Sequence, residues 1–284
     1  MKIFSQGGAS VLASRNKNGG RPQGPAREDA RPTKMVFAFA AAILFLAVAA
    51  TAQTTNGFSD AEIQGRQLAR KILQQWPANN FTNAGLLNIR DENGKHFEHP
   101  IKCETVVTAT NWSSIYEKFL PVSASNSVKT LKLVILHDAS NSNQYKLTFN
   151  VGGDHWTEDN SDAIKLLSFA GDFGCADLGL EFFHWPEQKI IKKEFSRGRG
   201  CMVLESTNPN PSPNGYSRVV SWIDEESYGI VHAEAYDANG KLLKVFDPKS
   251  FKKVNGQWEL QDMEIRNVQT GSRTRIEFDL KSKS

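Results

Sequence analysis

The sequence predicts an α+β protein that is mostly β, with an antiparallel sheet that curls toward a barrel or half-barrel. Three observations predict this class. Apolar and polar residues alternate through most of the chain after residue 80, which is the period of a half-buried strand. Turn dipeptides such as Asn93-Gly94, Asn239-Gly240 and Asn255-Gly256 separate these runs and are typical of β-hairpins. Helical spacing of apolar residues is confined to two short segments.

An apolar segment near the N-terminus predicts export. The run Val36–Ala50 has no charged or polar side chain, Arg31 and Lys34 precede it, and Ala50-Thr51-Ala52 follows it. A basic flank, a short apolar core and small residues at the exit are typical of a secretory signal. A membrane anchor is the alternative, but a spanning helix needs about 20 apolar residues and anchoring charges. We therefore expect residues 35–52 to be a signal peptide, cleaved after about Ala52, and the protein to be periplasmic with no stable membrane span.

The predicted signal peptide separates an N-terminal leader from a single domain. Residues 1–34 are rich in Gly, Arg, Asn and Pro and show no apolar periodicity, so they cannot bury a core. They are either a disordered leader or lie upstream of an alternative start at Met35. Residues 53–284 then form a single domain, a length that is ordinary for barrel-like folds.

The charge balance argues against a nucleic-acid partner. The whole chain has a formal net charge of +3. Residues 1–52 hold seven of the 34 basic and two of the 31 acidic residues, which leaves 27 and 29 after cleavage and a net charge of −2. A nucleic-acid-binding protein is expected to keep a basic face. The local cluster Lys192, Lys193, Arg197 and Arg199 is interpreted as the solvated end of a hairpin.

The first helix is predicted by its N-terminal signal and its spacing. Ser59-Asp60-Ala61-Glu62 is a capping-box pattern, in which the hydroxyl and the carboxylate satisfy free backbone amides. Leu68, Ile72, Leu73 and Trp76 follow at helical spacing, and Pro77 cannot continue a helix. We expect this helix over residues 59–76.

Strands dominate the rest of the chain. Period-two alternation predicts early strands near 84–90, 101–110, 112–119, 129–136 and 144–151. A break follows at 152–162, residues 163–168 fit either a strand or a helix, and 177–184 predicts a short amphipathic helix. The last third predicts a meander of short strands near 190–195, 201–206, 216–223, 230–237, 241–246, 251–254, 258–268 and 276–280. A long twisted meander tends to curl and protect its edges.

Three cysteines, Cys103, Cys175 and Cys201, lie after the expected cleavage site. An oxidising compartment allows one disulfide and leaves one thiol. We expect Cys175 to pair with Cys201, because each lies beside a segment that should pack together.

Catalytic and metal-binding motifs are weak. There is no Gly-x-Ser-x-Gly, no phosphate-binding loop and no His-Glu-x-x-His. His96 and His99 are three residues apart, and on a strand this spacing does not converge on one metal. A hydrolase would need His155 or His184 beside a nucleophile or acid in a pocket, which no spacing indicates. We expect no catalytic residues, no metal and no cofactor.

Aromatic residues are the best candidates for ligand contacts. Phe182, Phe183 and Trp185 concentrate apolar area in one short segment, and Trp222 adds to it. Core packing explains any one of them. Together they are also what a lipid-binding concavity requires, because apolar area holds an acyl chain with few polar groups. We interpret these four residues as candidate lipid contacts.

The second half of the chain also resembles a known family. The resemblance lies in Asp177–Trp185, Tyr216–Asp224, Ala235–Asp237, Gly240-Lys241 with Lys244, Gly256 with Trp258, and Thr270–Thr274. With the order signal peptide, helix, curved sheet, short helix and meander, these segments resemble the LolA-like carriers, the bacterial outer-membrane lipoprotein-sorting proteins. The resemblance spans most of residues 59–280 and is best after residue 175.

The resemblance implies an incomplete antiparallel β-barrel whose open side is covered by helices, over a cavity for acyl chains. It implies a soluble periplasmic carrier of lipids or lipoproteins, which takes an acyl chain as ligand and meets other envelope proteins. The alternative is a non-catalytic structural or interaction module of the cell envelope that has the same fold and a filled core, because fold does not fix function.

Overall fold

The computed structural model describes residues 58–121, 128–150, 156–254 and 257–280. The expected leader and signal peptide, and with them the predicted cleavage site, lie outside the described residues, as does His155. None of the described helices is long and apolar enough to cross a membrane.

The first helix is confirmed, with a shorter C-terminal end. Helix α1 (Asp60–Leu73) begins with the predicted capping box. The backbone amide of Glu62 donates to Ser59 Oγ at 3.4 Å, and the amide of Ser59 donates to Glu62 Oε2 at 2.7 Å. The helix ends at Leu73 instead of Trp76, because Pro77 disfavours helical geometry in the residue before it.

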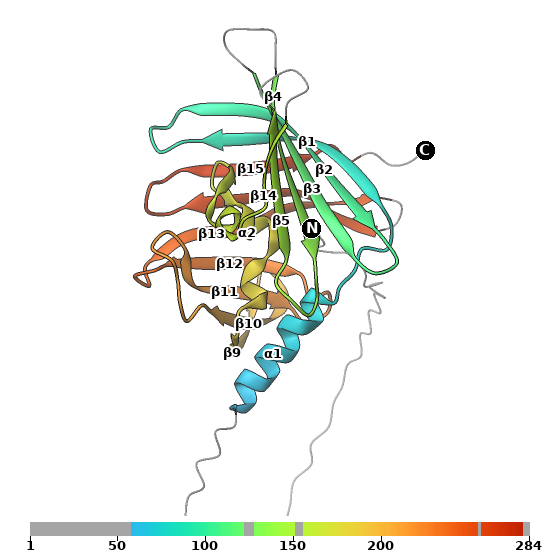
Figure 1. The fold of residues 1–284 in the computed structure, drawn as a ribbon. Helices are drawn as coiled ribbons and strands as arrows, with labels where there is room; N and C mark the ends of the chain where they lie inside the picture. The colour runs from blue at the N-terminus through green and yellow to red at the C-terminus, as the bar shows by residue number, and fades with distance from the viewer. Residues whose placement is uncertain (1–57, 122–127, 151–155, 255–256, 281–284) are drawn as a thin grey trace, which may run out of the picture. The chain divides into compact units, whose positions relative to one another are not determined.

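One antiparallel sheet of thirteen strands dominates the described residues (Figure 1). Its order is β6-β5-β4-β3-β2-β1-β15-β14-β13-β12-β11-β10-β9. The sheet is curved and its edge strands β6 and β9 do not pair with each other, so the predicted incomplete barrel is confirmed. The strands are β1 (Phe81–Arg90), β2 (His96–Val107), β3 (Trp112–Pro121), β4 (Val128–His137), β5 (Gln144–Asn150), β6 (Trp156–Asp159), β9 (Glu187–Ser196), β10 (Arg199–Thr207), β11 (Tyr216–Asp224), β12 (Ile230–Asp237), β13 (Leu242–Val254), β14 (Gln257–Asn267) and β15 (Arg273–Phe278).

The pairing of β1 with β15 joins the early strands to the C-terminal meander. Its register runs from Gly85 opposite Phe278 to Arg90 opposite Arg273. A Cβ at Gly85 would lie 2.4 Å from the carbonyl oxygen of Glu277, so only glycine fits this close backbone approach. One continuous sheet, with one concave face, follows from this pairing.

Strand β13 differs from the prediction. The segments 241–246 and 251–254 were expected to be separate strands, but they form one strand, β13, that pairs with β14 throughout. The register is irregular between Pro248 and Phe251. A bulge of this kind accommodates a proline, which has no amide hydrogen for the ladder.

Short helical and strand segments lie on the concave side. Residues 163–168, which fitted either a strand or a helix, contain the 3-10 helix η1 (Asp162–Leu166). Two strands too short to show a period form a small hairpin, β7 (Ser168–Ala170) and β8 (Phe173–Gly174). The helix predicted over 177–184 is divided into α2 (Cys175–Gly179) and the 3-10 helix η2 (Glu181–His184). The division falls at Leu180, which has a left-handed φ of 52°.

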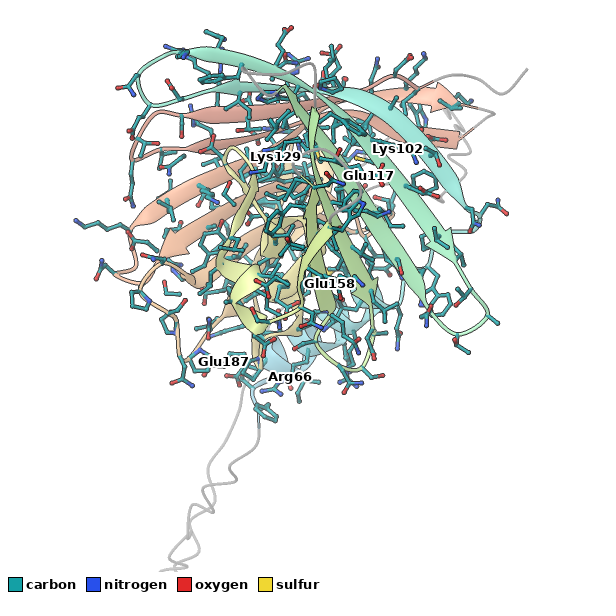
Figure 2. All side chains as sticks on the ribbon, turned by 45° about the horizontal axis from the view of Figure 1, so that its top comes forward. Arg66, Lys102, Glu117, Lys129, Glu158 and Glu187 are labelled. Carbon is teal, nitrogen blue, oxygen red and sulfur yellow. The ribbon has the colours of Figure 1, made fainter. Side chains whose placement is uncertain are left out.

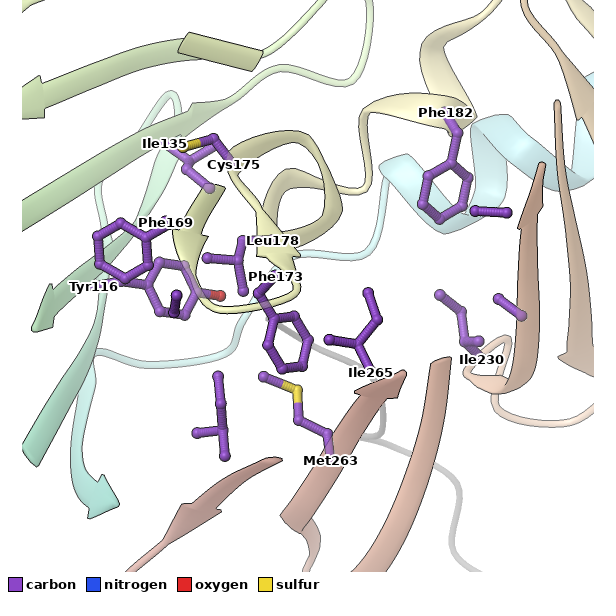
Figure 3. Close-up of a cluster of buried hydrophobic side chains, with 14 of the residues drawn as sticks. Tyr116, Ile135, Phe169, Phe173, Cys175, Leu178, Phe182, Ile230, Met263 and Ile265 are labelled. Carbon is purple, nitrogen blue, oxygen red and sulfur yellow. The ribbon is translucent and has the colours of Figure 1, made fainter. Parts of the chain in front are cut away.

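The core fills the space between the sheet and these segments. Phe169, Phe173 and Leu178 are each 1% exposed, and Figure 3 shows them beside Tyr116 and Met263 of the sheet. Helix α1 packs closely on β9, where a Cβ at Gly65 would lie 2.6 Å from the backbone of Gln188.

The convex face of the sheet carries charged side chains. Glu117 of β3 lies 3.1 Å from Lys132 Nζ of β4 and 4.0 Å from Lys102 Nζ of β2. Figure 2 shows Glu117 and Lys102 on their neighbouring strands. Exposed ion pairs of this kind contribute little to stability, and the face is therefore organised for solvent contact.

The cysteines differ from the expected pairing. Cys103, Cys175 and Cys201 are all free, buried thiols, so the predicted disulfide between Cys175 and Cys201 is not formed in this structure. Cys175 lies in α2 within the main core, whereas Cys201 lies on β10 at a position that alternates with the core residues Met202 and Leu204. Successive strand residues point to opposite faces, which separates Cys201 from Cys175.

Candidate functional site

An apolar pocket lies between the concave face of the C-terminal strands and the residues that cover it. Its cavity volume is only about 30 Å³. We call residues 175–184, which include α2 and η2, the cover segment. The apolar lining residues are Phe173, Leu180 and Phe182 from β8 and the cover segment, and Val219, Ile230, Ala233, Ala235, Phe246 and Ile265 from the sheet.

Small side chains on β12 create the pocket. Ala233 and Ala235 alternate along this strand and both face the cover segment. Ala233 lies opposite Phe246 of β13, so a short side chain stands beside a large one. The ring of Phe246 meets that of Phe173 edge-on, with centroids 6.4 Å apart. The hollow therefore lies where two alanines of β12 stand beside the large Phe246 of β13.

Three polar residues meet at one end of the pocket, and we call them the Asp177 cluster. Tyr216 Oη on β11 donates to Asp177 Oδ1 at 2.8 Å. Lys244 Nζ on β13 lies 3.2 Å from Asp177 Oδ2 and donates to the carbonyl oxygen of Asp172 at 2.7 Å. Burial, together with the Asp177 charge, raises the pKa of Tyr216 well above its ordinary value. This cluster holds α2 against β11 and β13.

A second group holds the other end of the cover segment to the N-terminal strands. Tyr145 Oη of β5 donates to Glu181 Oε2 at 3.0 Å, and Lys165 Nζ lies 2.9 Å from Glu181 Oε1. Asn143 Nδ2 donates to the carbonyl oxygen of Gly179 at 2.7 Å. The cover segment is thus bound to both halves of the sheet, and displacing it requires breaking polar contacts on each side.

Three of the four aromatic residues predicted as lipid contacts lie together at this pocket. Phe182 lines it. The Phe183 ring lies beside that of Phe182 at 4.5 Å between centroids, and Trp185 meets Phe182 edge-on at 6.4 Å. Whether they contact lipid stays a prediction.

Trp222 lies elsewhere. It is on β11 between Ser221 and Ile223, which face the core, and its indole Nε1 donates to Glu194 of β9. It therefore occupies the convex face and does not line the pocket. Trp222 is half-buried there against His232, with ring centroids 4.9 Å apart. Sequence reasoning grouped it with the cover segment by residue type alone.

Sequence reasoning did not identify the small and charged residues of the site as pocket residues. Ala233 belongs to no motif, and Ala235 and Lys244 lie in segments that carry the family resemblance, which assigned them no role in a pocket. The alternation of alanines in residues 230–237 was visible, but the face they occupy depends on the register of β12 with its neighbours.

The histidines are not brought together at a metal site. His96 and His99 are three residues apart on β2, so they point to opposite faces. Within the described residues, no three His, Cys, Asp or Glu side chains are placed to hold a metal ion. His184 is partly buried, and this burial lowers its pKa, while Glu181 and Asp138 nearby act in the opposite direction.

The comparisons with known proteins agree on the fold. A family profile described as "-like: Uncharacterized protein" matches residues 164–281. A DUF1329 family protein from Desulfovibrio piger is 17% identical over 78% of this chain and 92% of its own, with a TM-score of 0.63. A domain from Vibrio parahaemolyticus assigned to outer-membrane lipoprotein sorting is 18% identical over 77% and 92%, with a TM-score of 0.62.

A LolA superfamily protein from Nitrosomonas europaea is 16% identical over 80% of this chain and 95% of its own, with a TM-score of 0.52. No curated protein sequence matches this chain. Structural similarity at sequence identities this low shows a shared fold but does not show a shared function. The resemblance of the sequence to LolA-like proteins is confirmed at that level, and the chain has the LolA-like half-barrel fold.

Proposed function

We propose that this protein is a periplasmic carrier that binds the acyl chain of a lipid or lipoprotein beneath its cover segment. The supporting observation is the apolar pocket between the cover segment and the C-terminal strands. Burial of an acyl chain is favoured by apolar area and needs few polar partners. The Vibrio domain assigned to outer-membrane lipoprotein sorting has the same fold. The predicted signal peptide would direct export of this chain and would be cleaved after about Ala52.

Binding requires the cover segment to move. The cavity volume of about 30 Å³ is enough for about two water molecules, because each one needs about 10–15 Å³. The closed pocket is therefore too small for an acyl chain. Displacing α2 would extend the pocket along the aromatic rings of Phe182 and Phe183. This movement would break the Asp177 cluster on one side and the hydrogen bond from Asn143 to Gly179 on the other.

One observation favours the second candidate, a non-catalytic envelope module with a filled core. Phe169, Phe173 and Leu178 occupy much of the concave face and are almost fully buried. A core packed in this way is complete without a ligand, and its task would then be contact with other envelope proteins.

Lipid bound during expression separates the two candidates. The mature protein, residues 53–284, is purified from the periplasm and weighed by native mass spectrometry, and the bound material is extracted and identified. A carrier should show added masses that correspond to acyl-chain species. A single apo mass, together with no uptake of a fluorescent fatty acid, would reject the carrier and leave the envelope module.

A pocket variant tests the location of the site. Ala233→Leu fills the hollow with a larger apolar side chain, and Ala84→Leu adds the same atoms at an exposed position of β1. We expect Ala233→Leu to weaken the affinity for a fluorescent fatty acid at least ten-fold, while Ala84→Leu leaves it unchanged. Overpacking costs about 1–3 kcal/mol, so far-ultraviolet circular dichroism must show that both variants stay folded. Equal affinities in the two variants would place the acyl chain elsewhere.

A further inference from the structure

Three arginines lie side by side across the convex face of the sheet. Arg90 of β1 lies directly opposite Arg273 of β15, which lies directly opposite Arg266 of β14. These strands are neighbours in the sheet (Figure 1). Each arginine alternates with inward residues such as Ile89, Thr274 and Ile265, so all three side chains start from the same face. We call Arg90, Arg266 and Arg273 the arginine row.

No carboxylate forms an ion pair with the arginine row within the described residues. All three arginines are exposed. The nearest acidic residues of these strands have other partners. Asp262 is bound by Arg275, and Glu264 lies 3.0 Å from Lys249 Nζ. Like charges directly opposite one another in a sheet are destabilising, so the fold keeps a repulsive arrangement that an anion would relieve.

A polar hollow lies beside the arginine row. It has a volume of about 200 Å³ and is lined by Asn88, Ile89, Arg90, His96, Glu264, Arg273 and Arg275. His96 lies directly opposite Arg90 on β2, and Asn88 lies directly opposite Arg275 on β15. Guanidinium groups and an amide from adjacent strands therefore surround one space, which differs in character from the apolar pocket on the concave face.

We propose that this hollow is a binding site for a phosphate group, from inorganic phosphate or from a phospholipid headgroup. The planar fork of arginine donates two hydrogen bonds to a phosphate at once. Neighbouring strands are about 4.8 Å apart, which places Arg90 and Arg273 on two sides of a tetrahedral anion. The Asn88 amide supplies a further donor, and Lys249 offsets the charge of Glu264. This site is independent of the acyl-chain pocket.

Thermal unfolding of the full mature chain tests the site. Melting temperatures are measured in increasing sodium phosphate and in sodium chloride of equal ionic strength. The variants are Arg273→Gln, Arg90→Gln and, as a matched control, Arg70→Gln on the exposed side of α1. We expect phosphate to raise the melting temperature of the wild type and of Arg70→Gln beyond the effect of chloride. We expect Arg273→Gln and Arg90→Gln to need at least ten-fold more phosphate for the same rise.

Loss of folding would not produce this pattern. In low salt without phosphate, Arg273→Gln should melt at the wild-type temperature or above it, because it removes a like-charge pair. It should also take up a fluorescent fatty acid as the wild type does, which separates this site from the proposed carrier function. Equal phosphate responses in the wild type and Arg273→Gln, or no response beyond chloride, would overturn the proposal.

Vesicle flotation distinguishes the two sources of phosphate. Flotation of the wild type with phosphatidylglycerol vesicles but not with phosphatidylcholine vesicles, and its loss in Arg273→Gln, would assign the site to anionic headgroups. A phosphate-dependent rise in melting temperature without flotation would assign it to soluble phosphate. If neither assay separates the wild type from Arg273→Gln, the proposal is wrong.

Discussion

The hydroxyl of Tyr216 donates a hydrogen bond to the carboxylate of Asp177 across the opening of the apolar pocket, at 2.8 Å. The two residues are 39 positions apart in the sequence and join β11, near one edge of the sheet, to the helix that covers it. Lys244 adds an ion pair to Asp177 from β13, two strands away from β11. Because the Asp177 and Lys244 side chains are only 12% and 16% exposed, solvent screens this contact weakly. It therefore resists displacement of the cover segment.

Removing one hydroxyl should loosen the cover segment. Tyr216→Phe keeps the ring and deletes the bond to Asp177, and we expect the free energy of unfolding to fall by about 1.5 kcal/mol, because hydrogen bonds to charged groups contribute about 1.5–3 kcal/mol. Uptake of a fluorescent fatty acid should become faster. Urea unfolding and stopped-flow fluorescence measure the two effects.

The control for this substitution is Tyr236→Phe, which removes a hydroxyl that donates to Glu234 on the convex face. It should leave the uptake rate unchanged. Faster uptake in both variants, or in neither, would mean that the Asp177 cluster does not control entry.

The close approach of α1 to β9 should reverse the usual effect of replacing a helical glycine. Gly65→Ala normally stabilises an exposed helix by about 1 kcal/mol. Here the added Cβ would lie 2.6 Å from the backbone of Gln188, whose side chain is bonded to Phe182 and Ser206. We therefore expect a loss of about 1–3 kcal/mol in chemical unfolding. Gln67→Ala, at an exposed position of the same helix, should change stability by less than about 0.5 kcal/mol, and a stabilising Gly65→Ala would contradict the packing.

A partly buried histidine should make the fold sensitive to mild acid. His137 stacks on Trp112 at 3.7 Å between ring centroids and contacts Ser114 Oγ through Nε2 at 2.8 Å. Burial holds its pKa well below the ordinary 6.5. Below pH 6.5 the unfolded chain takes up the proton first, so stability is full above this pH and is lost as the pH falls toward the folded-state pKa.

The variant His137→Phe keeps the stacking and removes this proton uptake. Free energies of unfolding measured between pH 7 and pH 5 should fall less steeply for His137→Phe than for the wild type. A residual slope is expected, because burial also lowers the pKa of His184 and His99. Identical slopes for the two proteins would show that His137 is accessible to protons in the folded state.

The thiols can be counted directly. Burial raises the pKa of Cys103 and of Cys175 to about 12, and a thiol reacts as its thiolate. We expect Ellman's reagent to react negligibly with the native protein at neutral pH and to titrate three thiols per chain in urea. One thiol per chain in urea would show that a disulfide, such as the predicted Cys175–Cys201 pair, forms in the exported protein.

Local features of the fold were predictable from the sequence. The capping box at Ser59 and Glu62 starts α1 where expected. Gly94 and Gly240, at φ of 81° and 75°, close the hairpins that their dipeptides predicted. Interactions between neighbours in the chain decide these features, and such interactions are present in the sequence itself. Strands too short to show a period, such as β7 and β8, gave no signal of this kind.

The candidate site was predictable only in part. The aromatic residues of the cover segment were identified because they are adjacent in sequence. Trp222 was grouped with them, but the alternation of β11 places it on the convex face. The hollow at Ala233 depends on the register of β12 with its neighbours. A shift of one residue would move Ala233 from the concave to the convex face of the sheet, and the types of residue in the strand do not determine this register.

The sequence by itself determined the start of the first helix, most of the longer strands and the turns between them. The tertiary structure alone decided that Gly85 meets Phe278 and joins the two halves of the sheet, that Asp177 meets Tyr216 and Lys244, and that three arginines share one face. These contacts join residues distant in the chain. Bringing such residues together costs chain entropy, and no single contact offsets this cost. Many contacts of the core must form together, so the packing of the whole core selects which distant residues meet.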